Sequence, residues 1–397
     1  MHLAYTKEQQ ELSDELRAYF AQLITDDVRA ELKLEGGEMF RKILMQMGQD
    51  GWLGLGWPEE YGGQGRPPTD QFIFFDEAQR AQAPIPFVTL NTVGPTLIEF
   101  GSDEQKAEFL PRILAGEITF AIGYTEPESG TDLASLQTKA VRDGDEWVIN
   151  GQKIYTSGAD DADHVWLACR TNTEVKKHKG ISLIIVPTST EGFSWTPLVT
   201  VGGVSTTSTF YDDVRVPYGN LVNEENEGWR LITTQLNHER IGLAALSAFA
   251  FRVYDEVVDW AATTPASPDG DPAAPNAAMI DRSWVQTELA ACHAELEAMK
   301  LMNWQLASAV AAGTLKPADT SAVKVFGTES LVRIYHRLQG IVGPVGYVDP
   351  ASSGAVLAGR LELASRRAQI NTFGGGVNEI QREIVAWMGL GLSRASR

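Results

Sequence analysis

The stretch ITFAIGYTEPESGTD at residues 118–132 opens the part of the chain that decides the fold. In it, a run of β-forming residues meets a tight turn rich in Gly, Pro and Ser. Further runs follow: TKAVRDGDEWVINGQKIYTSG (138–158), HVWLACR (164–170), ISLIIVP (181–187) and TFYDDVRVP (209–217). Alternating or fully apolar runs separated by Gly, Asn-Gly and Pro are typical of antiparallel strands. We therefore predict a central β domain at residues 118–228, with a turn at 125–131 whose backbone amides could meet a ligand.

Both flanks of this β domain have the spacing of helices. Thr6 can cap the first helix, in which Leu12, Leu16 and Phe20 recur at helical intervals. The pattern predicts helices at 6–47, 69–82, 90–101, 103–114, 225–262, 279–312, 317–340 and 354–370, with a last helix within 371–389. The sequence therefore predicts an α+β protein with an N-terminal helical domain at 1–117 and a C-terminal helical domain at 229–397.

Two segments are predicted to be connections between helices. DGWLGLGWPEEYGGQGRPP (50–68) is rich in Gly and Pro, and its glycines are too irregularly placed for a phosphate-binding loop. We expect a structural turn there that carries buried Trp52 and Trp57. The segment 263–277 has no apolar periodicity and is expected to be an exposed loop.

Composition excludes several classes of protein. The formal charge of −19 argues against a general binder of nucleic acid or of anionic membranes, since both would repel an acidic surface. With only Cys169 and Cys292, a disulfide scaffold is not expected. The first residues do not resemble a signal peptide and no apolar run is long enough for a membrane helix, so a cytoplasmic protein is expected. The histidines have no metal-ligand spacing, and neither cysteine lies in a nucleophile motif.

The motifs YTEPESGTD (124–132), NGQKIYTSG (150–158), NHER (237–240) and GGGVNEIQREIVA (374–386) occur in an order that resembles the acyl-CoA dehydrogenase family of flavoproteins. The resemblance covers essentially the whole chain, and it is greatest to actinobacterial enzymes of steroid side-chain degradation. It implies a central β-barrel or sandwich, a C-terminal four-helix bundle, FAD as cofactor and α,β-dehydrogenation of an acyl-CoA thioester. Electrons would pass to an electron-transferring flavoprotein.

The reaction needs a carboxylate base in a dry, apolar pocket, because an unassisted α-proton is too weakly acidic for an ordinary carboxylate. The commoner family position for this base corresponds here to Gly374-Gly375-Gly376, which holds no carboxylate. The other position corresponds to Glu239, whose helical face carries Leu236, Leu243 and Leu246. We therefore assign the base to Glu239, with Arg240 tuning its orientation. A salt bridge of Glu239 with a basic group, or Glu379 as the base, are the alternatives.

The resemblance also implies the flavin contacts. Tyr124 and Thr125 would bind the pyrimidine end of the ring, and Thr131 would lie beside the flavin or the ligand's phosphates. Tyr155, Thr156 and Ser157 correspond to the segment that stacks near the ring and contacts flavin N5, with Thr156 favoured over Ser157 for that contact. A simple turn is the alternative interpretation of each Ser/Thr-rich segment taken alone.

The chain departs from the family at the far end of FAD. The arginine that binds the cofactor's pyrophosphate in most members would fall in the segment 263–277, which contains no Arg or Lys. A second cofactor motif is reduced to Gly340-Ile341-Val342-Gly343-Pro344-Val345-Gly346. Because a pyrophosphate without a cation would bind poorly, we expect an α2β2 heterotetramer in which a homologous subunit supplies the missing groups.

The sequence leaves alternatives open for the substrate and for the function of this chain. Small residues after Glu239 (Gly242, Ala244 and Ala245) would widen a pocket for a bulky steroid-CoA ester, or would merely pack the helix. A catalytically silent structural subunit and an acyl-CoA oxidase of the same fold are the competing functions.

Overall fold

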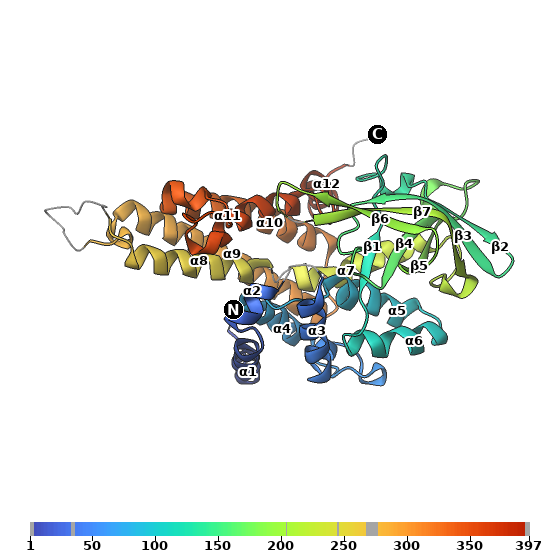
Figure 1. The fold of residues 1–397 in the computed structure, drawn as a ribbon, viewed down its shortest axis with the longest axis horizontal. Helices are drawn as coiled ribbons and strands as arrows, with labels where there is room; N and C mark the ends of the chain where they lie inside the picture. Colours follow the sequence, from blue (N-terminus) through green and yellow to red (C-terminus); the bar gives the residue numbers. More distant parts are fainter. Residues whose placement is uncertain (1–3, 33–35, 204, 244–245, 267–276, 394–397) are drawn as a thin grey trace.

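A computed structural model describes residues 4–32, 36–203, 205–243, 246–266 and 277–393. For residues 236–243 and 246 it describes the helical backbone and not the side chains. A helical N-terminal block is followed by a β-sheet and then by long C-terminal helices, and the sheet lies at one end of an elongated molecule (Figure 1). The predicted order of helical, β and helical domains is confirmed.

The N-terminal block packs its helices around one apolar core. Thr6 accepts a hydrogen bond from the backbone amide of Gln9 and closes a capping box, as its position before the first periodic residue predicts. Leu12, Leu16 and Phe20 are buried on one face of the first helix. The block contains α1 (Lys7–Leu23), α2 (Asp26–Glu31), α3 (Glu38–Gln49), α4 (Pro68–Ala81), α5 (Gly94–Phe100) and α6 (Asp103–Leu114).

The connection at 50–68 contains only two short 3-10 turns, as predicted. Trp57 is buried and donates its indole N–H to the carbonyl of Leu90, whereas Trp52 is only partly buried. Gly94 lies directly under the Trp57 ring, where an added Cβ would come within 2.0 Å of a ring carbon. The tryptophan therefore requires glycine at this position.

Seven strands form one sheet. They are β1 (Phe120–Gly123), β2 (Lys139–Asp143), β3 (Glu146–Ile154), β4 (His164–Arg170), β5 (Ile181–Pro187), β6 (Phe193–Val199) and β7 (Ser205–Pro217). The hydrogen-bonded order is β1-β4-β2-β3-β7-β6, and β5 pairs with β4. Every residue of β4 is buried, which explains why its sequence is a continuous apolar run instead of an alternating one.

Three details of the β prediction need correction. The sheet is mixed, because β1 pairs with β4 in parallel; the intervening hairpin gives the chain enough length for such a crossover. The last strand begins at Ser205 instead of residue 209. Strand β6 was not predicted, since it is an exposed edge strand containing Pro197, and so lacks the apolar alternation of its neighbours.

The C-terminal part consists of α7 (Gly228–Leu243), α8 (Leu246–Thr263), α9 (Ser283–Ala311), α10 (Pro317–Val342), α11 (Arg360–Ala368) and α12 (Asn378–Ile384). Helices α7 and α8 both lie within the segment predicted as one helix at 225–262, and residues 244–245 between them are outside the described residues. Most of the expected loop at 263–277 lies outside the described residues. Helices α8 to α11 pack around a second apolar core that extends away from the sheet (Figure 1).

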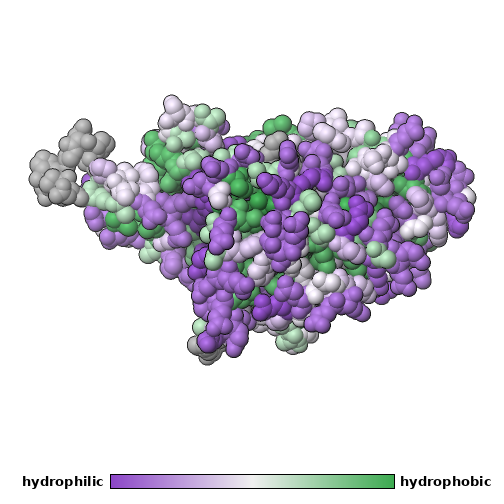
Figure 2. All heavy atoms as spheres, turned by 60° about the horizontal axis from the view of Figure 1, so that its bottom comes forward, coloured by the Kyte–Doolittle hydropathy of each residue, from purple (hydrophilic) through white to green (hydrophobic). Residues whose placement is uncertain are grey.

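Helix α7 connects the three parts of the molecule. It packs against β5 on one side and against α4 and α5 on the other. A second connection joins sheet and bundle: Arg366 Nη1 donates to the carbonyl of Val201 at 2.6 Å, and Arg367 Nε donates to that of Gly202 at 3.2 Å. The face of the molecule seen in Figure 2 is largely hydrophilic, with apolar patches between the hydrophilic residues. Within the part of the chain that the structure describes, no helix has the length and apolarity to cross a membrane.

Candidate functional site

The turn after β1 is fixed by a buried ion pair. Lys153 on β3 is fully buried, and its Nζ lies 2.8 Å from Oε1 of Glu126 and 3.1 Å from the carbonyl oxygen of Tyr124. The turn also closes on itself, because Glu126 and Ser129 exchange two backbone hydrogen bonds of 2.9 and 3.1 Å. The backbone of residues 124–129 is therefore held rigidly against β3.

Both carboxylate oxygens of Glu126 are already used in hydrogen bonds, so this group is not available as a base. Its two carboxylate oxygens accept the amides of Gln137 at 2.6 Å and Thr138 at 2.8 Å in addition to Lys153. Burial alone would raise the pKa of this carboxyl, but the Lys153 ammonium and the amide donors outweigh burial and hold the pKa below its usual range. Glu126 is thus an ionised structural group and not a candidate base.

A hydrogen-bonded chain links the same turn to helix α7. The amide Nε2 of Gln235 on α7 donates to the hydroxyl of Tyr124, and the indole N–H of Trp166 on β4 donates to Oε1 of Gln235 at 3.3 Å. Gln235 and Trp166 are both fully buried. The β1 turn, the centre of the sheet and α7 are therefore held in one fixed relation.

The predicted base lies on this helix. The backbone of Glu239 and Arg240 belongs to α7, but their side chains, like those of Leu236 and Leu243, fall outside the described residues. Gln235 and Glu239 are one helical turn apart, so their positions share a face of α7. Position 239 is therefore on the face of the helix from which Gln235 reaches Tyr124.

Tyr155, Thr156 and Ser157 follow directly after β3. Tyr155 is exposed and has a positive φ of 59°. Thr156 is fully buried, and its hydroxyl lies 3.3 Å from that of Thr209. Ser157 is exposed, with its hydroxyl 2.9 Å from that of Thr206. Ser157 is therefore the exposed residue of the two and Thr156 the buried one, and which of the two hydroxyls contacts the flavin stays a prediction.

The two remaining threonines lie on the β1 turn. Thr125 is partly buried, and its carbonyl accepts the amide of Ile154 at 2.8 Å, which joins the turn to the end of β3. Thr131 is exposed at the far side of the turn. The structure therefore brings five predicted residues (Tyr124, Thr125, Tyr155, Thr156 and Ser157) together beside the end of β3. Their flavin contacts stay predictions.

Other candidate groups lie elsewhere or are inert. Glu379 is exposed in the first turn of α12. Burial raises the pKa of the Cys169 and Cys292 thiols to about 12, so both stay protonated. Burial lowers the pKa of His164 to about 4. Among the described residues, no group of His, Cys, Asp and Glu could hold a metal ion.

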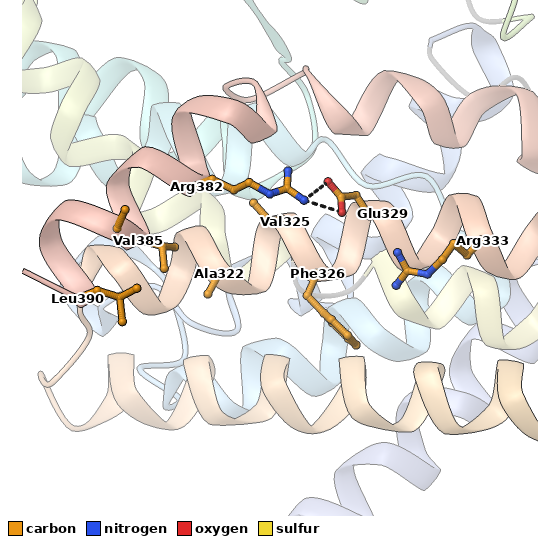
Figure 3. A pocket seen from close by; sticks show the side chains of 9 residues that line it. Ala322, Val325, Phe326, Glu329, Arg333, Arg382, Val385 and Leu390 are labelled. Carbon is orange, nitrogen blue, oxygen red and sulfur yellow. Dashed lines mark hydrogen bonds and ion pairs between the residues drawn. The ribbon is translucent and has the colours of Figure 1, made fainter. Parts of the chain in front are cut away.

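A shallow groove lies between α10 and the C-terminal turn that follows α12 (Figure 3). It is lined by apolar side chains, including Val325, Phe326 and Val385, and Arg382 and Glu329 form an ion pair of 2.7 Å at its edge. None of the predicted site residues lines this groove.

Lys153, Glu126 and Gln235 were not among the residues predicted from the sequence. Lys153 and Glu126 lie within the motifs NGQK and TEPESGTD that the sequence identifies. Their ion pair was not predicted, because the two residues are 27 positions apart in the chain. No local pattern signals Gln235, whose partner Tyr124 is 111 residues away in the chain.

Comparison with known proteins agrees with this architecture. The chain matches the acyl-CoA dehydrogenase N-terminal, middle and C-terminal domain models at residues 6–117, 121–214 and 226–389. It is 52% identical to acyl-CoA dehydrogenase FadE26 and 49% identical to acyl-CoA dehydrogenase FadE29, both of Mycobacterium tuberculosis, with 100% of each chain covered.

Two solved structures are similar over 100% of both chains. The Tcur3481-Tcur3483 steroid ACAD has a TM-score of 0.93 and 53% identity, and the ChsE4-ChsE5 complex from Mycobacterium tuberculosis has a TM-score of 0.92 and 52% identity. With three domain models matched in order and relatives this similar over their whole length, the chain belongs to the acyl-CoA dehydrogenase family and is an acyl-CoA dehydrogenase.

Proposed function

We propose that this chain is the base-bearing subunit of an FAD-dependent heteromeric dehydrogenase that oxidises a bulky steroid side-chain CoA ester, with Glu239 as the base. The observation that carries the proposal is the hydrogen bond from Gln235 to Tyr124. It aims one face of α7 at the β1 turn, and position 239 lies on that face one turn further along the helix.

The residues beside the end of β3 are suited to the ring end of FAD. The exposed Tyr155 ring offers an apolar surface, the exposed Ser157 hydroxyl offers a hydrogen-bonding group, and the β1 turn is held in place by Lys153. When bound, FAD would accept the hydride that leaves the β-carbon of the acyl group.

In this mechanism Glu239 takes the α-proton of the thioester. A carboxylate can do this only if its environment raises its pKa toward neutrality, and the leucines predicted on the same face would supply such a dry surface. Trp166 and Gln235 would not exchange protons. Their buried hydrogen bonds fix α7 relative to the β1 turn, which supports a site where the base and the flavin would face the same acyl group.

Replacement of Ser157 by Ala tests the flavin contact. Loss of one neutral hydrogen bond costs about 1 kcal/mol, so we expect FAD to bind about fivefold more weakly. The dissociation constant is measured by flavin fluorescence on titration of the cofactor-free protein. Ser194→Ala, at an exposed position on β6, is the matched control and should leave the constant unchanged. An unaltered constant in Ser157→Ala would remove this residue from the flavin site.

A partner subunit is proposed because the segment 263–277, where most family members carry the arginine for the FAD pyrophosphate, contains no Arg or Lys. The exposed apolar side chains near the C-terminus support the proposal, since they suit a protein contact better than water. These include Ile370, Phe373, Met388, Leu390 and Leu392, of which Leu390 also lines the apolar groove of Figure 3. Both similar structures described above carry the names of two chains.

Co-expression tests this assembly. With a homologous chain that carries the missing arginine, we expect a yellow complex with flavin absorbance near equimolar to the active sites. The chain expressed alone should purify with little flavin, because an unpaired pyrophosphate binds poorly. A flavin-saturated assembly of this chain alone would contradict the partner proposal.

The same complex tests the substrate. We expect turnover of a steroid side-chain CoA ester, with a dye or an electron-transferring flavoprotein as acceptor, and a much lower kcat/KM for a straight-chain acyl-CoA. The steroid assignment derives from the similar steroid ACAD and from the small residues Gly242, Ala244 and Ala245, whose side chains lie outside the described residues. Equal kcat/KM for both esters would contradict it.

A further inference from the structure

Lys324 on α10 binds three oxygen atoms of one short segment. Its Nζ lies 3.2 Å from the carbonyl oxygen of Thr372, 2.7 Å from that of Gly376 and 2.7 Å from Oδ1 of Asn378. An ammonium group carries three protons, so these three acceptors use all of them. Lys324 is half-buried and forms no ion pair with a carboxylate among the described residues, so these neutral oxygens are its direct partners.

The segment that Lys324 binds, residues 372–378 (the glycine segment), has Gly374, Gly375 and Gly376 in its middle. Successive glycines leave a backbone with many conformations of similar energy, and two of these three have positive φ values, 65° and 96°. Lys324 binds the carbonyl that precedes the glycines, the carbonyl of the last glycine and a side chain two residues further along. One cation therefore closes the glycine segment on itself and joins it to α10.

The glycine segment lies where the bundle meets the sheet. It follows α11, whose Arg367 donates to the carbonyl of Gly202 in the turn between β6 and β7. On β7, the hydroxyl of Thr206 meets that of Ser157, one of the predicted flavin residues. Helix α12, which follows the glycine segment, lies at the end of the bundle next to the sheet (Figure 1). Phe373 and the three glycines are exposed, so this stretch can meet a ligand.

We propose that Lys324 is a positioning residue for the dehydrogenation and that its ammonium holds the glycine segment as one wall of the acyl site. The inference rests on the proposed function, because it takes the acyl group to lie between Glu239 and the glycine segment. Lys324 acts through this segment and not on the reacting atoms. Since misplacement of a substrate by about 1 Å can cost about 100-fold in rate, a loose wall would lower kcat more than it weakens CoA binding.

The hold on the glycine segment depends on pH. Burial lowers the pKa of Lys324 to about 8, although the carboxylates of Glu379 on α12 and Glu329 on α10 act in the opposite direction. Glu329 is itself paired with Arg382 at 2.7 Å. The glycine segment and the turn Val385–Gly389, which also packs against α10, carry no titratable side chain. Above about pH 8 the neutral amine can donate to only two of the three oxygens, so the segment should loosen.

The test compares the complex carrying Lys324→Met with the unaltered complex from about pH 7 to about pH 9.5. At neutral pH we expect kcat to be about tenfold lower in the variant, with little change in the affinity for free CoA. The ratio of the two rates should fall toward one as the pH rises through about 8, because the unaltered complex then loses its ammonium too. Titration of groups common to both complexes cancels in this ratio.

Two further variants complete the comparison. Lys324→Arg keeps a charge that does not titrate in this range, so its rate relative to the unaltered complex should rise through the same pH. This variant decides the question even if Lys324→Met does not assemble. Lys106→Met, at a half-buried position on α6, is the matched control and should keep the original rate at every pH. Rates of the Met and Arg variants that stay in constant proportion to the unaltered rate would overturn the inference.

Amide hydrogen exchange separates this inference from the proposed function. Peptides that cover the glycine segment should exchange faster in Lys324→Met than in the unaltered complex, whereas Lys106→Met should leave them unchanged. Unchanged exchange would show that Lys324 does not hold the segment, and faster exchange with unchanged kcat would make Lys324 a structural anchor only. Either result overturns the inference. If the unaltered complex oxidises no acyl-CoA, the proposed function fails, and the exchange data still decide whether Lys324 holds the segment.

Discussion

Glu239→Gln is expected to lower kcat for acyl-CoA oxidation by about 100-fold to 10,000-fold, the usual contribution of a general base. Glutamine has nearly the same shape as glutamate but cannot accept the α-proton at neutral pH. Position 239 lies on the face of α7 that Gln235 directs at Tyr124. Because glutamine keeps the shape of glutamate, the change should leave the fold and the flavin spectrum intact. The measurement is steady-state turnover together with the visible absorbance of the purified complex.

The matched control for this prediction is Glu379→Gln. It makes the same chemical change at an exposed position in α12, and turnover should stay at the original rate. If Glu239→Gln keeps full turnover, or if Glu379→Gln loses it, the assignment of the base is wrong. A silent structural subunit would predict no effect of either change.

Lys153→Met is expected to destabilise the protein by about 3–5 kcal/mol, because it leaves the Glu126 carboxylate buried without its cation. Both side chains of the pair are buried, and Lys153 Nζ also holds the carbonyl of Tyr124. The free energy of unfolding is measured by chemical denaturation of the complex. Lys139→Met, at an exposed position on β2, should have little effect.

A second variant separates loss of the pair from loss of packing. Glu126→Gln combined with Lys153→Met removes the uncompensated charge and should recover part of the stability that Lys153→Met loses. Equal stability of the single variant and the unaltered protein would show that the pair does not hold the β1 turn.

The stabilisation by the Lys153–Glu126 ion pair should decrease in acid. Because the pKa of Glu126 lies below its unfolded value of about 4.3, the pair contributes fully above that pH and less as the pH falls toward the lower folded value. The part of the unfolding free energy that depends on Glu126 should therefore be constant near neutrality and decline only below about pH 4.

The local features of this fold are those that sequence patterns describe well. Strands β4 and β5 begin and end at the predicted residues, since fully apolar runs bounded by polar groups and Pro leave little freedom. The Thr6 cap likewise depends on residues three apart. Strand β6 escaped prediction because its stability derives from pairing with β7 and not from its own apolar pattern.

The site depends on contacts that no local pattern contains. Lys153 meets Glu126, and Gln235 meets Tyr124, only after the sheet and α7 have packed together. The sequence favours Thr156 over Ser157 for the flavin contact, but an alignment of motifs cannot tell that Thr156 is buried and Ser157 exposed, and the contact itself stays a prediction. Glu239 could be singled out earlier, since both its apolar helical face and the glycines at the commoner base position are visible in the sequence.

Exchange of the α-hydrogen of the substrate tests the central claim most directly. In deuterated buffer, the complex should introduce deuterium at the α-carbon of a bound acyl-CoA, as followed by mass spectrometry of the recovered ester. The account predicts that Glu239→Gln abolishes this exchange while flavin absorbance and CoA binding persist. Exchange at the original rate in that variant would contradict it, because another group would then be removing the proton.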